Sequence, residues 1–162
     1  MDSETVIAAS AVVIAVASLV VSVLQGRAAR RHNRNSVRPL LVLQRTLVPG
    51  PVAGLRLTNS GLGPAVVTST VVMVDGEKIG PWSKASADRI RTALGLWPTV
   101  MTFREPQYLA TGYDEYLLRL SDYRRDHVEF TELINHRLYL EIRYESLYGG
   151  ENFRAILTPG VL

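Results

Sequence analysis

The stretch RLYLEIRYESLYGGENFRAIL, residues 137–157, decides the fold. In its first half four largely apolar side chains alternate with four polar ones: Leu138, Leu140, Ile142 and Tyr144 against Tyr139, Glu141, Arg143 and Glu145. Because successive side chains of a strand point to opposite faces, this alternation predicts an antiparallel strand with a buried apolar face and an exposed charged face. Gly149-Gly150 then predicts a tight turn into a second strand. The C-terminal part is therefore expected to be a β-hairpin on a core.

Upstream of this hairpin, period-two patterns separated by turn residues predict further strands. They cover residues 40–47, 52–59, 65–79 and 113–120, and the third contains Asp75-Gly76, a dipeptide typical of hairpin turns. Pro-Gly-Pro at 49–51 and the glycines and proline of SGLGPA at 60–65 mark the turns between the early strands. Six or seven short strands within about 120 residues predict an immunoglobulin-like antiparallel β-sandwich, with a small open barrel as the alternative.

Two short helices are expected between these strands. The first covers residues 87–94, with Ser86 as its N-cap. The second runs through Phe130, Leu133 and Ile134, with Asp126 and Glu129 forming a capping box. The segment from 80 to 112 has the least regular pattern, and long irregular insertions are where binding residues tend to lie.

The N-terminal segment TVIAASAVVIAVASLVVSVLQ, residues 5–25, contains no charged residue, no proline and no glycine. At a helical rise it spans about 30 Å, the thickness of the hydrocarbon core of a bilayer, so it predicts a single transmembrane helix. A buried core helix and a cleaved signal peptide are the alternatives. The acidic start and the arginines that follow favour an uncleaved anchor over a signal peptide.

The charge distribution predicts which way this helix is oriented. Residues 1–26 carry two acidic and no basic side chains, residues 39–162 are neutral, and the net charge of +3 arises from the arginines of residues 27–38. Basic flanks stay in the cytoplasm, so residues 1–4 are expected outside an inner (plasma) membrane and the domain of residues 39–162 inside. The basic juxtamembrane linker, residues 26–38, is expected to contact anionic lipid through five arginines: Arg27, Arg30, Arg31, Arg34 and Arg38.

Small side chains recur along the apolar segment with alternating spacings of three and four. They are Ala8, Ala11, Ala15, Ser18 and Ser22. Small residues at this spacing let two helix backbones approach closely, so this seam predicts packing against a second membrane helix, either a second copy or a protein partner. An alanine- and serine-rich segment can also show such spacing by chance.

Three motifs together resemble a group of small bacterial membrane proteins. They are HNRNSVRP at 32–39, LTNSGLGPAVV at 57–67 and IRYESLYGG at 142–150. The resemblance covers most of the chain and implies one N-terminal membrane helix followed by a cytoplasmic β-sandwich. Its motifs are structural, so it implies no catalytic residues.

The sequence offers few groups for catalysis. The absence of cysteine excludes disulfides, thiolate metal sites and cysteine nucleophiles. His127 and His136 are expected about 13 Å apart on one helix, too far to share a metal, and His32 lies in the basic linker. Acid pairs such as Glu141 and Glu145 fit a solvated charge ladder better than a general acid and base. No catalytic residue, metal or cofactor is therefore expected.

Aromatic side chains are the remaining candidates for contact with a partner, because exposed aromatics favour interfaces; packing in the core is the alternative for each of them. Four are considered: Trp82, Trp97, Tyr139 and Tyr148. The expected function is that of a membrane-anchored, non-enzymatic interaction or scaffold module. The alternatives are a small enzyme or ligand-binding domain using residues 80–112, and a sensor of anionic lipid or nucleic acid through Arg27–Arg38. Nucleic acid is the less favoured partner, because the folded part has no net positive charge.

Overall fold

The computed structural model describes residues 2–104 and 106–160. Within the first helix the side chains of residues 5, 6, 8–10 and 31–35 lie outside the described set. The chain divides into two units, residues 1–36 and residues 37–162.

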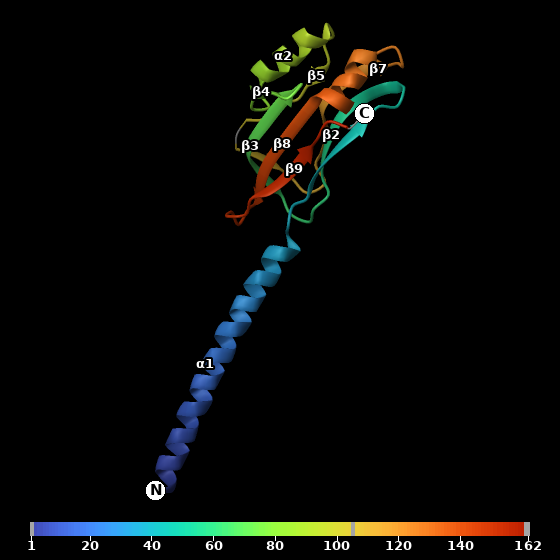
Figure 1. The fold of residues 1–162 in the computed structure, drawn as a ribbon. Helices are drawn as coiled ribbons and strands as arrows, with labels where there is room; N and C mark the ends of the chain where they lie inside the picture. The colour runs from blue at the N-terminus through green and yellow to red at the C-terminus, as the bar shows by residue number, and fades with distance from the viewer. Residues whose placement is uncertain (1, 105, 161–162) are drawn as a thin grey trace. The chain divides into compact units, whose positions relative to one another are not determined.

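The first unit is a single helix, α1 (Ser3–Ser36). Its segment Ala11–Arg30 has a mean hydropathy of 1.9 and none of it is buried, so α1 is long and apolar enough to cross a membrane. The basic stretch expected to form a linker is itself helical as far as Ser36 (Figure 1). Its arginines therefore continue the helix that carries the apolar segment.

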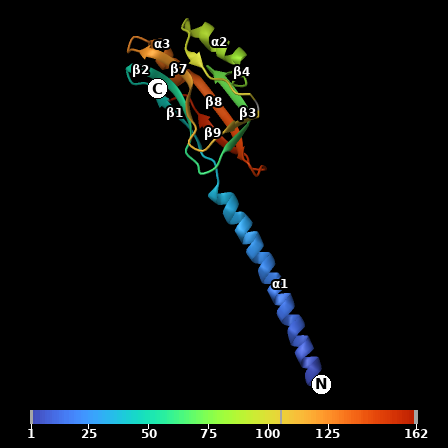
Figure 2. The same ribbon diagram turned by 180° about the vertical axis from the view of Figure 1, so that it is seen from behind.

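The second unit is a β-sandwich of two antiparallel sheets. The first sheet has the order β1 (Leu41–Thr46), β2 (Gly50–Asn59), β7 (Asp114–Tyr123), β5 (Thr99–Val100). The second has the order β4 (Glu77–Gly80), β3 (Ala65–Val74), β8 (Leu138–Ser146), β9 (Phe153–Leu157), and β6 (Gln107–Leu109) pairs with the start of β3. These orders correspond to strands A-B-E-D and C′-C-F-G of an immunoglobulin domain. The predicted immunoglobulin-like sandwich is confirmed (Figures 1 and 2).

Alternation along the strands produces the core between the sheets. The four apolar residues of β8 that were predicted to share one face are all buried. In the facing sheet, Leu55 and Leu57 of β2 and Leu118 of β7 are fully buried. The turn after β3 uses Asp75 and Gly76, both with positive φ (54° and 81°), as a type I′ hairpin requires. The strand predicted over 65–79 is therefore the β3–β4 hairpin.

Both predicted helices exist, but their N-terminal signals are different from those expected. Helix α2 (Lys84–Leu94) begins one turn earlier, with Ser83 as N-cap accepting from the Ser86 amide, and Ser86 itself is buried in the first turn. Helix α3 (Val128–Glu132) has His127 at its N-cap and no side-chain cap, so the predicted Asp126–Glu129 capping box is wrong. It continues directly into a π-helical turn, η1 (Leu133–Arg137).

A buried asparagine fixes the point at which the chain joins the sandwich. The Asn59 Oδ1 atom accepts hydrogen bonds from the amides of Leu40 (3.2 Å) and Gly61 (3.1 Å). Its Nδ2 atom donates to the carbonyl oxygens of Gly63 (2.9 Å) and Ala110 (3.1 Å). One amide thus ties together the incoming segment, the loop after β2 and the loop before β7.

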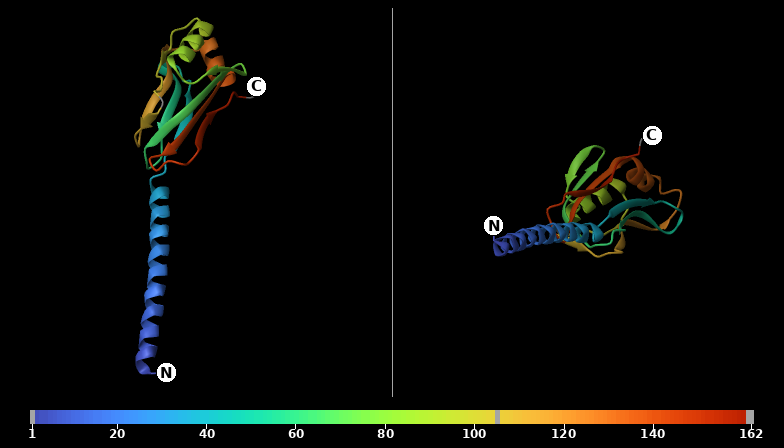
Figure 3. Two further views of the ribbon diagram at one scale, coloured as in Figure 1. Left: turned by 90° about the vertical axis from the view of Figure 1, so that its left-hand side faces the viewer. Right: turned by 90° about the horizontal axis from the view of Figure 1, so that it is seen from below.

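The sandwich has a proximal end and a distal end. The proximal end is where residues 37–40 join it, and it also contains the loops 60–64 and 110–113 and the β8–β9 turn. The distal end contains the turns at 47–49, 75–76 and 124–127. Helices α2 and α3 also lie at the distal end (Figures 1 and 3).

Candidate functional site

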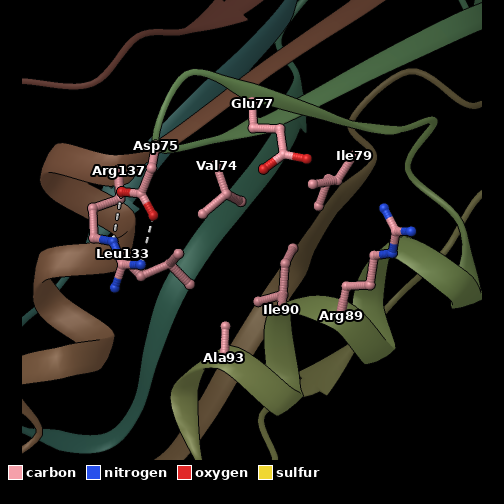
Figure 4. Close-up of a pocket in the computed structure, with 9 residues that line it drawn as sticks. All are labelled: Val74, Asp75, Glu77, Ile79, Arg89, Ile90, Ala93, Leu133 and Arg137. Carbon is pink, nitrogen blue, oxygen red and sulfur yellow. Dashed lines mark hydrogen bonds and ion pairs between the residues drawn. The ribbon is translucent and has the colours of Figure 1, made fainter.

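A pocket of about 210 Å³ opens at the distal end of the sandwich. Its apolar lining comes from the β3–β4 hairpin (Val74, Ile79), from α2 (Ile90, Ala93) and from η1 (Leu133). Figure 4 shows these side chains converging from the three elements. Ile90 and Leu133 are buried core residues, so the floor of the pocket is the top of the sandwich core.

One side of this distal pocket is formed by an ion pair between Asp75 and Arg137. The Arg137 Nε and Nη2 atoms donate to the two Asp75 oxygens at 2.8 and 2.6 Å, and the Asp75 amide donates to the Arg137 carbonyl. This hydrogen bonding lowers the pKa of Asp75 below its ordinary value. The carboxylate is therefore ionised at neutral pH, and its contribution to stability is lost only as the pH falls through the lowered pKa.

The rim of the distal pocket also carries Glu77 from β4 and Arg89 from α2, both exposed. Among the described residues, neither side chain makes an ion pair. They offer one negative and one positive group above an apolar floor. Such an arrangement suits an apolar side chain of a partner that is flanked by polar or charged groups.

The π-helical turn η1 places two of the lining residues. It carries Leu133 into the floor and Arg137 to the ion pair with Asp75. π-helical turns are rare and occur frequently at functional sites. The rare backbone geometry of η1 therefore lies at the wall of this pocket.

Beyond the pocket, α2 is followed by an exposed tryptophan. Trp97 is 77% exposed, and the Arg91 guanidinium lies 5.5 Å from the centre of its ring. Arg91 is itself held by the Pro98 carbonyl (3.1 Å) and by Asp88 (2.9 Å). A large aromatic side chain that is exposed and supported on one face is the typical anchor of a protein interface.

The four aromatic candidates from the sequence do not form one surface. Trp82 is only 2% exposed and its Nε1 atom donates to the Met101 carbonyl (2.6 Å), so it is a core residue and the expectation of a contact role is corrected. Tyr139 is partly buried on the outer face of β8, and Tyr148 is exposed at the proximal end. Of the four, Trp97 is the exposed aromatic next to α2, where the Arg91 guanidinium lies over its ring.

The polar face of β8 is a hydrogen-bonded ladder. Glu141 accepts from Arg143 Nε (2.7 Å) and from the Tyr139 hydroxyl (2.9 Å). These two bonds, the one from Arg143 first, lower the pKa of the Glu141 carboxyl. A carboxyl held ionised in this way is not tuned to act as a general acid at neutral pH. Glu141 is more buried than the predicted exposed ladder implies, because its neighbours cover it.

Two of the histidines contact backbone groups around α3 and η1. His127 Nδ1 accepts from the Arg124 amide (3.1 Å), and His136 Nδ1 lies 3.3 Å from the Gly160 carbonyl oxygen. The side chain of His32 is outside the described residues. No group of three potential metal ligands occurs among the residues that the structure describes.

On α1, the described members of the predicted seam are exposed: Ala11, Ala15, Ser18 and Ser22. The Ser22 hydroxyl donates to the Ser18 carbonyl oxygen (2.8 Å), as serines in apolar helices commonly do. The side chain of Ala8 lies outside the described set, as do those of Arg31 and Arg34. Positions 27, 30, 31 and 34 fall on one face of the helix, since they are three and four residues apart.

Sequence reasoning missed the distal pocket. The ion pair at its edge joins Asp75 and Arg137, which are 62 positions apart in the sequence, and nothing in this spacing predicts their contact. The predicted hairpin turn at Asp75-Gly76 and the irregular 80–112 segment were the two signals that pointed to its walls. No protein-family model, curated protein or solved structure matches this chain.

Proposed function

We propose that this protein is a membrane-anchored, non-enzymatic interaction module. Helix α1 would hold the immunoglobulin-like sandwich at the cytoplasmic face of the inner membrane and confine it to two dimensions, which raises its effective concentration near membrane partners. The observation that carries the proposal is the combination of an unburied apolar helix with a sandwich whose distal end presents a pocket and an exposed tryptophan.

The anchor is supported by length, composition and flanking charge. Segment Ala11–Arg30 is unburied and apolar, and in water such a surface would be strongly unfavourable. The arginines lie at the C-terminal end of this segment and directly after it, which favours a cytoplasmic domain. They would also bind anionic headgroups, at about 1 kcal/mol for each residue near the surface.

The partner surface is proposed at the distal end. The floor of the distal pocket would take an apolar side chain of the partner, and Glu77 and Arg89 would contact groups beside it. Trp97 would supply the neighbouring aromatic contact. A surface on this end leaves the proximal end to the anchor, so one chain could hold membrane and partner together.

Labelling of single cysteines in intact cells tests the anchor and its orientation. The chain has no native cysteine, so Ser3→Cys and Thr111→Cys, both at exposed positions, give signals without background. We expect a membrane-impermeant thiol reagent to label Ser3→Cys only. Labelling at Thr111→Cys alone would place the domain outside, and recovery of the unlabelled chain in the soluble fraction would overturn the anchor.

Removal of the exposed tryptophan is expected to weaken partner binding. With a photo-reactive amino acid in place of Ala93, at the edge of the distal pocket, a partner should be crosslinked in cells. The change Trp97→Ala should weaken that complex about thirtyfold, because aromatic anchors of interfaces contribute 2 kcal/mol or more. Titration of the affinity-purified partner would measure it. Tyr108→Ala, an exposed aromatic of β6, is the matched control, and equal losses for both variants would count against the distal surface.

Packing of α1 against a second helix is expected to depend on its small residues. Replacing Ala11, Ala15 and Ser18 by leucine should reduce disulfide crosslinking through Ser22→Cys severalfold, because leucine keeps the backbones apart. Val13→Leu with Val20→Leu, off the seam, should leave the yield unchanged. Unchanged crosslinking in the triple variant would remove the seam from the proposal.

A further inference from the structure

Large apolar side chains are exposed on the loops of the proximal end. Leu62 is 76% exposed, Leu147 63% and Tyr148 56%, and Leu40 beside them is also exposed. Single exposed apolar residues are ordinary; what distinguishes these four is that they lie around the segment that leads to the apolar helix.

These residues come from segments that lie together. Leu40 and Leu62 line one shallow hollow with Pro39 and Gly61. Leu147 and Tyr148 form the tip of the β8–β9 hairpin. The Arg38 guanidinium lies 4.5 Å from the ring centre of Phe153, the first residue of β9, so the incoming segment contacts the base of that hairpin.

The polar groups among them suit an interfacial position. Arg38 adds a positive charge, and tyrosine is enriched at membrane–water interfaces because its ring is apolar and its hydroxyl polar. The two carboxylates of the hairpin bond to its own chain: Glu145 accepts from the Gly150 amide (2.9 Å) and Glu151 from the Ser146 hydroxyl. Their charge is therefore partly compensated within the turn.

Chain length places this end near the lipid. From Arg30, the last residue of the candidate membrane span Ala11–Arg30, to Ser36 the helix advances about 9 Å. From Gln25, the last residue of the uncharged segment, it advances about 16 Å. The headgroup layer on one side of a bilayer is about 5–8 Å thick, and membrane helices tilt by about 20° on average. Along the chain, the sandwich unit therefore begins no more than about 10 Å of helix beyond the headgroup layer.

We propose that the proximal end of the sandwich is a lipid-contacting surface. Leu62, Leu147 and Tyr148 would dip into the headgroup–acyl boundary of the bilayer that α1 crosses, and Arg38 would contact anionic headgroups. The occupant of this surface is the bilayer itself, not a protein. The inference rests on the proposed anchor, but it applies on whichever side of the membrane the domain lies.

The test uses the full chain in nanodiscs of neutral and anionic phospholipid, prepared with one chain or with several chains in each disc. An environment-sensitive fluorophore is attached to Leu62→Cys or Tyr148→Cys, and a spin-labelled lipid headgroup serves as the quencher. Val48→Cys and Val128→Cys, at distal positions that are 68% and 58% exposed, are the matched controls. We expect blue-shifted emission and at least twofold stronger quenching at the proximal positions.

Three further outcomes separate the possible failures. Water-like emission at Leu62 and Tyr148, equal to the controls, would overturn the inference. A blue shift without quenching by lipid, or one that disappears when discs hold a single chain, would mean that a protein covers this surface and would also overturn it. A label at Leu19→Cys in α1 reports on the anchor: if Leu19 is quenched by spin-labelled acyl chains, the anchor holds whatever the proximal probes show.

Discussion

Replacing Asn59 by alanine is expected to lower the free energy of unfolding by about 3–5 kcal/mol, the largest loss for any polar residue of the sandwich. Asn59 is 1% exposed, and its amide satisfies backbone groups of three separate segments. Alanine would leave the partly buried Leu40 and Gly61 amides and the buried Gly63 carbonyl without these partners. A buried donor or acceptor that loses its partner costs about 1–3 kcal/mol.

Denaturant unfolding of the full chain in detergent measures this loss, with the fluorescence of the buried Trp82 as the signal. Asn152→Ala, at an exposed position in the β8–β9 turn, is the matched control and should change the free energy by less than about 0.5 kcal/mol. A loss below about 1 kcal/mol for Asn59→Ala would mean that the incoming segment is held by other contacts, such as the bond from the Leu41 amide to the Tyr144 hydroxyl (3.2 Å).

The second large effect is expected at Gly54, in the middle of β2. A Cβ atom there would overlap the carbonyl group of Leu118 on β7, and the backbone has a φ of 156°. Gly54→Ala must therefore separate the two central strands of the first sheet next to the β-bulge at Leu55 and Arg56. We expect a loss of about 3–5 kcal/mol, combining backbone strain with the disturbed core packing.

Gly112→Ala distinguishes the two causes of that loss. Gly112 has a φ of 73°, but an added Cβ atom would meet open space. Its replacement should cost about 1 kcal/mol, from the backbone conformation alone. Equal unfolding midpoints for the two variants would show that β2 and β7 tolerate the displacement, which contradicts the steric explanation for Gly54.

The fold could be predicted because its signals are local. The alternation in residues 138–145, the Asp75-Gly76 turn and the uncharged N-terminal segment each occupy neighbouring positions, and each produced the expected element. Helix starts were less certain because Ser83 and Ser86 are both good N-caps. Which of the two serines caps the helix depends on the path of the chain after β4. That path is fixed by the Trp82 amide, which donates a hydrogen bond to the Thr70 hydroxyl (2.8 Å).

The candidate site could not be predicted because it depends on long-range packing. Trp82 and Trp97 lie in similar stretches of sequence, yet Trp82 is buried in the core and Trp97 is exposed beside α2. Asp75 and Arg137 meet only because β3 and β8 pair with Val74 opposite Leu138, which brings the β3–β4 turn to the end of η1. Such contacts follow from the register of the sheet, which the sequence pattern does not specify.

The way the chain joins the sandwich also determines how the domain would bear mechanical load. Strand β1 begins at the proximal end and pairs with β2 in six consecutive positions, from Leu41 opposite Asn59 to Thr46 opposite Gly54. A pull between a membrane anchor and a partner at the distal end would act along these strands, at right angles to their hydrogen bonds. All bonds of the β1–β2 ladder would then be strained at once and would have to break together. If the chain is anchored in this way, the sandwich would resist tension along its strands and would yield to a much smaller force if β1 were peeled off sideways.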